Sequence, residues 1–170
     1  REFTSVFSDD IETVEVFFAN NQILFRSEHI SFYTRLLEGN YPDTDRLIPT
    51  EFNTEATFNV ANLRFAMERA RLLSNATQNG TVKLEFKNGV VSSHVHSPEV
   101  GRVNEEIDTS AVSGEDLSIS FNPTYLIEAL KAIDSEQVVI RFISSVRPFT
   151  LVPEGNEQGF IQLITPVRTN

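Results

Sequence analysis

A helix is predicted to begin in the stretch Phe121-Asn122-Pro123-Thr124-Tyr125-Leu126. Asparagine is favoured just before a helix because its side chain accepts a hydrogen bond from one of the first free backbone N–H groups. Proline is favoured at the next position, where the missing N–H costs no hydrogen bond. Apolar residues then recur at the spacing of a buried helix stripe, at Leu126, Ala129, Leu130 and Ile133. A strand is predicted to precede this helix, from Asp116 to Phe121.

The same pattern occurs earlier in the chain, where Phe58-Asn59 stands 63 residues before Phe121-Asn122 (121 − 58). A strand over 55–58 leads into a helix over 60–74, with Asn59 as its predicted N-cap. The predicted apolar stripe of this helix is Leu63, Ala66, Met67, Ala70 and Leu73. Three predicted strands follow each helix, at 81–87, 90–96 and 99–107 and then at 138–143, 147–152 and 160–164. Asn88-Gly89, between the first two of these, is a strong hairpin-turn signal. We therefore predict an α+β fold made of duplicated βαβββ units, with two helices packed side by side on antiparallel sheets.

The first part of the chain indicates a separate module. Strand-like runs cover 11–19, 22–27 and 30–37, and together they resemble the last three strands of another such unit. Asn20-Asn21 predicts a tight hairpin turn between the first two runs. The chain then turns at 38–40 and is predicted to run extended between Pro42 and Pro49, with Leu47 and Ile48 partly exposed. Two readings of this connector stay open: a plain linker, or one wall of a groove. The predicted domains are 1–44 and 45–170.

Composition excludes several classes of protein. The chain has 170 residues, 40% of them hydrophobic and 22% charged, so it can bury a core. It contains no cysteine, which excludes disulfides, a thiol nucleophile and a cysteine-ligated metal. No apolar run is long enough to span a bilayer, and a soluble cytoplasmic protein is expected. The formal charge of −10 means that any contact with DNA must be local, topological or both.

The sequence offers one candidate metal pair and no catalytic motif. His94 and His96 alternate on a predicted strand, so their side chains share one face, and a metal-dependent hydrolase is one alternative function. No third ligand is identifiable, and Ser93 and Ser97 suggest an exposed strand edge. A cluster of acidic residues around one loop is typical of a solvated surface: Glu105, Glu106, Asp108, Glu115 and Asp116. No enzyme activity and no cofactor are predicted.

Apolar segments from three places could form a groove. The last strand ends at Pro166 and is followed by Val167 and Arg168, and the loop 146–149 has a similar apolar character. Together with the connector around Leu47, these segments could converge into a peptide site. A second surface, on the polar sides of the helices, is mildly basic and more typical of a solvated face. Its cations are Arg64, Arg71 and Lys131, diluted by Glu68 and Glu128.

Three motifs, in order and at matching spacing, resemble one family. The stretches 35–43, 121–126 and 163–168 are similar to the bacterial DNA polymerase III β subunit, the replicative sliding clamp, in its Gram-positive form. The resemblance covers essentially the whole chain. It implies the DNA-clamp fold and a homodimeric ring of two three-domain subunits around duplex DNA. By this resemblance the chain is a C-terminal fragment: residues 1–44 match the end of the middle domain, and 45–170 match the third. Such a fragment is not expected to close a ring.

The resemblance also implies roles for single residues. The expected partner-peptide pocket consists of Pro42, Arg46, Leu47, Tyr125, Val146, Pro148, Leu163, Ile164, Thr165, Pro166, Val167 and Arg168. Its expected partners are the replicative polymerase, the clamp loader and repair proteins, each using a short linear motif. The resemblance places Leu72 and Leu73 in the subunit interface, and Arg64, Arg71 and Lys131 near DNA. The alternative is an unrelated intracellular protein-interaction module with a duplicated α+β unit.

Overall fold

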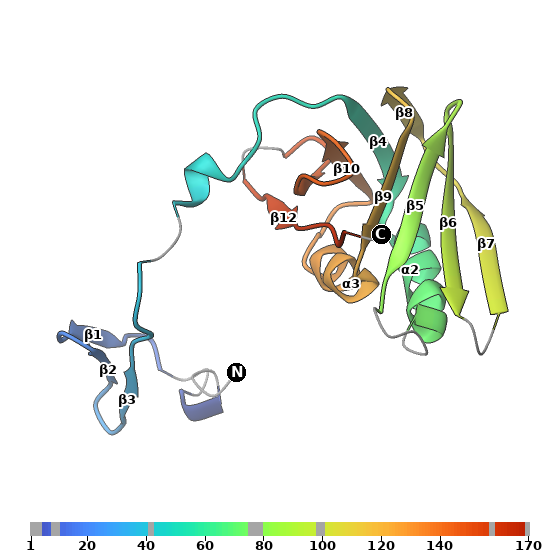
Figure 1. The fold of residues 1–170 in the computed structure, drawn as a ribbon. Helices are drawn as coiled ribbons and strands as arrows, with labels where there is room; N and C mark the ends of the chain where they lie inside the picture. The colour runs from blue at the N-terminus through green and yellow to red at the C-terminus, as the bar shows by residue number, and fades with distance from the viewer. Residues whose placement is uncertain are drawn as a thin grey trace. The chain divides into compact units, whose positions relative to one another are not determined.

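The computed structural model describes residues 5–7, 11–40, 43–74, 80–97, 101–156 and 159–168 (Figure 1). The chain divides into two compact units, Arg1–Asp43 and Thr44–Asn170.

The first unit contains a three-stranded antiparallel sheet. Its strands, in sheet order, are β1 (Glu15–Phe18), β2 (Gln22–Arg26) and β3 (Ser31–Arg35). The predicted hairpin at Asn20-Asn21 is confirmed, because the Ala19 N–H donates to the Gln22 carbonyl at 2.9 Å. All three strands are shorter than predicted. Large side chains on them remain exposed, notably Phe18 (76%) and Tyr33 (74%), so this sheet buries little apolar surface by itself.

The connector differs from its prediction. A 3-10 turn, η1 (Thr44–Arg46), interrupts the segment that was expected to be extended. The N–H groups of Leu47 and Ile48 both donate to the Thr44 carbonyl, at 3.0 and 3.2 Å. Each proline restricts only itself and the residue before it, so Thr44–Leu47 remained free to turn. Leu47 is 49% exposed and Ile48 is half-buried, as predicted. Pro42 lies outside the described residues.

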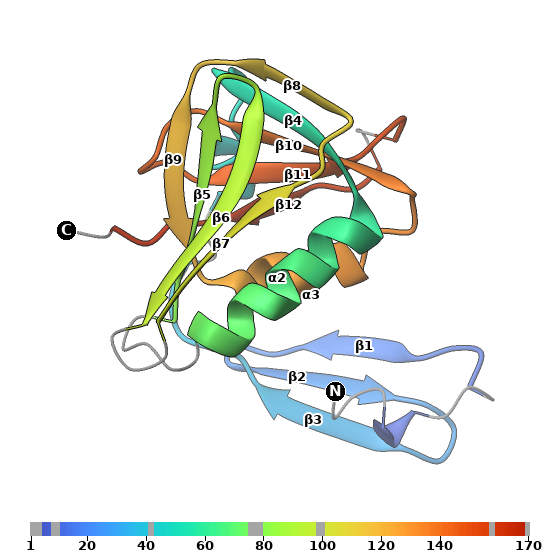
Figure 2. The same cartoon turned by 90° about the vertical axis from the view of Figure 1, so that its right-hand side faces the viewer.

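The second unit packs two helices against two antiparallel sheets, which confirms the predicted fold class. The helices are α2 (Val60–Ser74) and α3 (Pro123–Lys131), and they lie side by side (Figure 2). One sheet has the order β12 (Gln162–Ile164), β11 (Phe149–Pro153), β10 (Gln137–Phe142), β4 (Thr54–Asn59), β8 (Ala111–Gly114). The other has the order β7 (Gly101–Ile107), β6 (Val90–Ser97), β5 (Val82–Lys87), β9 (Leu117–Phe121). Strand β8 was not predicted, because its four residues show no alternation of apolar and polar side chains.

The two repeats exchange their first strands. Strand β4 opens the first repeat, yet it pairs with β10 of the second, with Phe58 opposite Val138. Strand β9 opens the second repeat and pairs with β5 of the first, with Phe121 opposite Val82. Each sheet therefore combines the first strand of one repeat with the last three strands of the other. Neither repeat can complete a sheet alone.

Both helices begin at the predicted caps. The Asn122 side chain accepts a hydrogen bond from the Thr124 N–H at 2.9 Å, and Asn59 accepts one from the Asn62 N–H at 3.0 Å. The predicted stripes face the core: Leu63, Ala66, Met67, Ala70, Leu126, Ala129 and Leu130 are all buried, and Leu73 packs against the core from its edge. Ile133 is also buried but lies beyond the end of α3, so it belongs to the core and not to the helix stripe.

Four phenylalanines join the sheets beneath the helices. The ring of Phe142 lies 4.9 Å from that of Phe86 and 5.1 Å from that of Phe149, which in turn lies 5.1 Å from Phe121. These centroid distances are typical of favourable aromatic pairs. The rings come from β5, β9, β10 and β11, so both repeats and both sheets contribute to one core.

Strand β6 lies inside its sheet and not at an edge, contrary to the suggestion drawn from its serines. It pairs with β5 on one side and β7 on the other. Ser93 and Ser97 are buried, at 2% and 0% exposure, because they point toward the core. The predicted turn before β6 is confirmed, since Asn88 (φ 51°) and Gly89 (φ 78°) both adopt the positive φ that a two-residue hairpin of type I′ requires.

Candidate functional site

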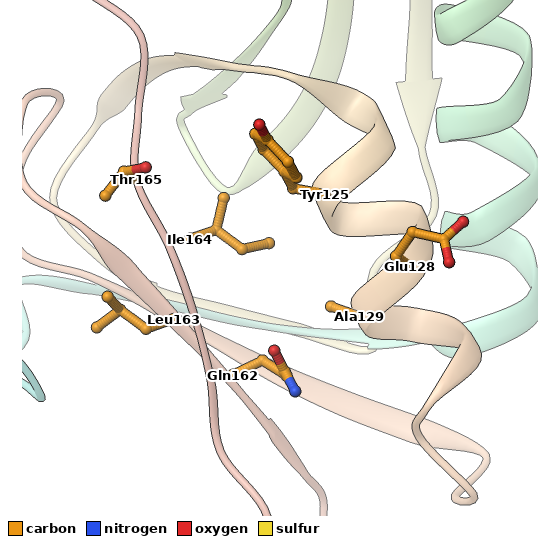
Figure 3. Close-up of a pocket in the computed structure, with 7 residues that line it drawn as sticks. All are labelled: Tyr125, Glu128, Ala129, Gln162, Leu163, Ile164 and Thr165. Atoms are coloured by element: carbon orange, nitrogen blue, oxygen red, sulfur yellow. The ribbon is translucent and has the colours of Figure 1, made fainter. Parts of the chain in front are cut away.

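An open pocket of about 490 Å³ lies between α3 and β12 (Figure 3). Helix α3 contributes Tyr125, Glu128 and Ala129, which share one helix face because they are three and four residues apart. The strand and the residue after it contribute Gln162, Leu163, Ile164 and Thr165. Asn122 fixes where α3 begins and therefore where Tyr125 stands relative to the strand. The structure thus brings together four predicted pocket residues: Tyr125, Leu163, Ile164 and Thr165.

The pocket has an apolar floor and a polar rim. Ile164 (5% exposed) and Ala129 (6% exposed) form the floor, whereas Tyr125 stands at the side and is 60% exposed. Glu128 and Thr165 are exposed at the rim. The Glu128 carboxylate is paired with Lys131 on the next helical turn, at 2.9 Å. An apolar side chain of a bound peptide could occupy the floor while its polar groups meet the rim.

The chain after β12 is held in place by the neighbouring sheet. The Val167 N–H donates to the Ser120 carbonyl on β9, at 2.7 Å. Pro166 is half-buried, and Val167 is 37% exposed. This hydrogen bond docks the segment against β9. It fixes the path of the segment that carries Thr165 along the pocket.

The other predicted pocket residues do not line this pocket. Val146 (54% exposed) lies in the turn between β10 and β11, and Pro148 is half-buried just before β11. Arg46 and Leu47 belong to the connector, and Arg168 is exposed after the docked segment. Pro42 is not among the described residues. The described residues among these all belong to the second unit, but none of them lines the pocket beside α3.

Sequence reasoning missed three residues of the pocket: Glu128, Ala129 and Gln162. Helical spacing from Tyr125 could have indicated the first two, because positions three and four residues later lie on the same face. Gln162 directly precedes the predicted residue Leu163. Composition and spacing carry no signal that this strand lies beside this helix, which only the family resemblance implied.

The mildly basic helix surface is partly neutralised. Arg64 and Lys131 line a small cavity of about 200 Å³ near the start of α2, so the structure brings these two together, whereas Arg71 is not part of that lining. Arg64 lies 3.8 Å from Glu68, and Lys131 is paired with Glu128. Elsewhere on α2, Arg69 donates to Glu105 of β7 at 3.2 Å, and this hydrogen bond raises the pKa of Arg69 above its ordinary value.

The two leucines at the end of α2 differ in environment. Leu72 is 73% exposed, while Leu73 is half-buried and packs against the core. Leu72 is therefore available to contact another protein, and Leu73 already has an internal role.

The histidine pair has polar neighbours from the same sheet. His94 contacts Ser92 and Asn104, each at 2.8 Å, and His96 accepts a hydrogen bond from Arg102 at 3.3 Å. Across the described ranges, no group of three or more His, Asp or Glu side chains is arranged to hold a metal ion. In the same part of the chain, no helix is both long and apolar enough to cross a membrane.

Residues 45–168 match the family model described as "DNA polymerase III beta subunit, C-terminal domain". The chain is 79% identical over 170 residues to the beta sliding clamp of Streptococcus pneumoniae serotype 4, and 55% identical over 172 residues to that of Lactococcus lactis. Both alignments cover 100% of this chain and 45% of the relative. The chain therefore spans less than half the length of these curated relatives.

Solved structures show the same fold. The DNA polymerase III beta chain of Streptococcus pneumoniae matches with a TM-score of 0.89 at 79% identity, covering 99% of this chain and 45% of that one. The DNA polymerase sliding clamp of Bacillus subtilis matches with a TM-score of 0.84 at 37% identity, covering 99% of this chain and 44% of that one.

Proposed function

Because this chain belongs to the family of C-terminal domains of the DNA polymerase III beta protein, we propose that it forms the partner-binding end of a bacterial sliding clamp. The predicted resemblance to a Gram-positive clamp is confirmed by the streptococcal and lactococcal relatives. Family membership decides against the alternative of an unrelated interaction module. A clamp is a non-catalytic processivity factor, so the role of this chain lies in binding and not in chemistry.

The observation that carries this proposal is the pocket beside α3. It lies within the span matched by the family model, and it combines an apolar floor at Ile164 and Ala129 with an exposed aromatic wall at Tyr125. Exposed aromatic residues beside an apolar pocket are typical anchors for binding energy. The pocket suits a short extended segment with one or two apolar side chains.

We infer that the partners are the replicative polymerase, the clamp loader and repair proteins, which bind through short linear motifs. Leu47, Val146, Pro148, Pro166 and Val167 are proposed to extend the binding surface beyond the pocket, with Arg46 and Arg168 orienting the bound segment. Val146 and Leu47 are about half exposed, which supports a contact role. Pro42 is included only on the family resemblance.

We further propose that the whole clamp is a cytoplasmic homodimeric ring around duplex DNA. In this proposal residues 1–44 end the middle domain, Leu72 contributes to the subunit interface, and Leu73 supports it from the core. Arg64, Arg71 and Lys131 would face DNA as sequence-independent phosphate neighbours. The formal charge of −10 and the ion pairs of Arg64 and Lys131 favour a topological hold on DNA over strong electrostatic binding.

The test is a fluorescence-anisotropy titration of this chain with a labelled peptide of the Gln-x-apolar-apolar type. We expect saturable binding. Tyr125→Ala should weaken it roughly 30-fold, because truncating an aromatic anchor that the bound peptide covers costs about 2 kcal/mol. The Tyr125 ring is exposed in the free chain, so its removal should leave the stability of the fold nearly unchanged.

Phe65→Ala is the matched control. Phe65 is a helix-surface aromatic of similar exposure (49%), but it lies on α2 and outside the pocket. It should leave peptide affinity unchanged. Equal effects of the two substitutions, or no saturable binding by the unsubstituted chain, would contradict the proposed pocket.

A further inference from the structure

A serine, a histidine and an asparagine form a chain of contacts on the polar face of the sheet β7-β6-β5-β9. Ser92 and His94 are two residues apart on β6, so they share one face, and Asn104 lies directly opposite His94 on β7. The Ser92 Oγ lies 2.8 Å from His94 Nε2, and Asn104 Oδ1 lies 2.8 Å from His94 Nδ1. This order of contacts places a hydroxyl on one ring nitrogen and an orienting acceptor on the other.

The contact with Asn104 determines which nitrogen of His94 carries the proton. An amide oxygen only accepts hydrogen bonds, so the Nδ1–H of His94 donates to Asn104 Oδ1. In the neutral ring Nε2 is then the bare nitrogen, and it accepts the Ser92 O–H. The serine hydroxyl is thus hydrogen-bonded to a positioned general base, the arrangement that activates a nucleophilic serine.

Charged side chains of both signs lie near His94. The Glu85 carboxylate on β5 lies 3.5 Å from His94 Nε2. Lys83, which faces His94 across the strands, lies 3.8 Å from Glu85. The His94 side chain is 27% exposed and Ser92 is half-buried, so a small reagent can reach both.

We propose that Ser92 is a site of covalent acylation by small activated acyl compounds, with His94 as general base and Asn104 as its positioning residue. The Ser92 oxygen bonds to the acyl carbon, the bond from that carbon to the leaving group breaks, and the leaving group departs with the bonding electrons. The serine proton passes to His94 Nε2 and then to solvent. This proposal is independent of the peptide pocket.

The reaction is expected to stop at the acyl-serine. Strand β6 lies between β5 and β7, and its backbone N–H groups donate hydrogen bonds to these two strands. They therefore do not form an oxyanion hole for an acyl oxygen. The site is therefore one of stoichiometric modification and not of turnover, which agrees with a non-catalytic protein.

Ser118 provides an internal control. It lies on β9, directly opposite Glu85 of β5. Ser92 lies opposite the same Glu85 on β6, the other neighbour of β5 in the sheet. Both serines therefore share one face of the sheet and one acidic neighbour, and Ser118 is the more exposed of the two. Only Ser92 has a histidine at hydrogen-bonding distance among these contacts.

The experiment exposes the full chain to p-nitrophenyl acetate and quantifies stable acetyl-serine by peptide mapping at early times. We expect Ser92 to be acetylated at least about tenfold faster than Ser118, because general-base assistance typically contributes 10²–10⁴-fold. His94→Gln should remove this difference without changing the rate at Ser118. Asn104→Asp should increase the rate at Ser92, since a carboxylate makes His94 a stronger base, and Asn104→Leu should decrease it.

A purely structural role for the three residues would not produce opposite effects of Asp and Leu at position 104. Similar acetylation of both serines, an unchanged rate in His94→Gln, or no acetyl-serine at position 92 would each overturn the proposal. The rate at Ser118, measured in the same sample, reports whether a substitution has disturbed the sheet.

Discussion

At Gly114, the last residue of β8, the backbone lies too close to the backbone of Asn53 and Thr54 to leave room for a side chain. A Cβ there would lie 2.8 Å from Thr54 Cα and closer still to the Asn53 carbonyl oxygen, and φ is +100°. We predict that Gly114→Ala lowers the free energy of unfolding by about 3 kcal/mol, because it adds a backbone clash to the strain of positive φ. Urea denaturation of the purified chain measures this change.

Gly155→Ala is the control that separates the cost of the backbone clash from the cost of positive φ. Gly155 also has positive φ (+78°), but nothing lies within 4 Å of its added Cβ. Its substitution should cost only about 1 kcal/mol, the strain of a left-handed backbone without a clash. Equal losses of stability at the two glycines would contradict the role assigned to the Asn53 carbonyl.

A second residue-scale prediction concerns the hydroxyl of Thr150 on β11. Thr150 is 1% exposed, and its Oγ1 has no hydrogen-bond partner within the ranges that the structure describes. A buried polar atom without a partner costs about 1–3 kcal/mol, so Thr150→Val should raise the free energy of unfolding by about 1 kcal/mol. Loss of stability in the same urea measurement would mean that the hydroxyl has a partner in solution.

At the scale of one element, helix α3 depends on its first residues. The Asn122 side chain accepts a hydrogen bond from the Thr124 N–H in the first turn of α3. The same turn carries Tyr125, which lines the pocket. Asn122→Ala should lower the free energy of unfolding by about 1 kcal/mol through loss of the cap. It should also weaken peptide binding, because fraying of the first turn releases Tyr125. Thermal denaturation and the anisotropy titration check the two effects.

Asn122→Asp and Asn59→Ala are the controls for that prediction. Aspartate caps helices as well as asparagine does, so Asn122→Asp should preserve both stability and binding. Asn59 caps α2, which does not contribute to the pocket, so Asn59→Ala should reduce stability alone. Weakened binding in Asn59→Ala would show that global stability, and not the position of Tyr125, controls affinity.

At the scale of the whole molecule, the exchange of first strands makes the two repeats interdependent. Residues 44–115 retain β4 but lack its partner β10, and they retain β5 but lack its partner β9. Phe58 would lose its cross-strand neighbour Val138, and Phe86 would lose the Phe142 ring. We predict that 44–115 and 116–170 are each unfolded alone and that mixing them restores the secondary structure seen by circular dichroism.

A cut at the boundary of the two compact units is the matched control. Residues 44–170 contain every strand of both sheets of the second unit, so this segment should fold alone. A folded 44–115 segment would show that the first repeat is an independent domain and that the exchanged strands add little stability.

The sequence by itself determined the features that depend on near neighbours. The bounds of α2 at Val60–Ser74, both asparagine caps and the Asn88-Gly89 turn were predicted because each depends on residues a few positions apart. The buried stripes followed from helical spacing, and the duplication followed from the repeated Phe-Asn at position 58 and position 121. Within the candidate site, Tyr125 and the strand residues came from the family resemblance and not from spacing.

The tertiary structure alone decided which strands are neighbours. The pairing of β4 with β10 joins residues such as Phe58 and Val138, which no local pattern connects. The same long-range pairing makes β8 a strand, through its ladder with β4. It also lays β12 beside α3 and so adds Glu128 and Gln162 to the pocket. Local chemistry forms the elements, but only burial of a shared core selects their partners.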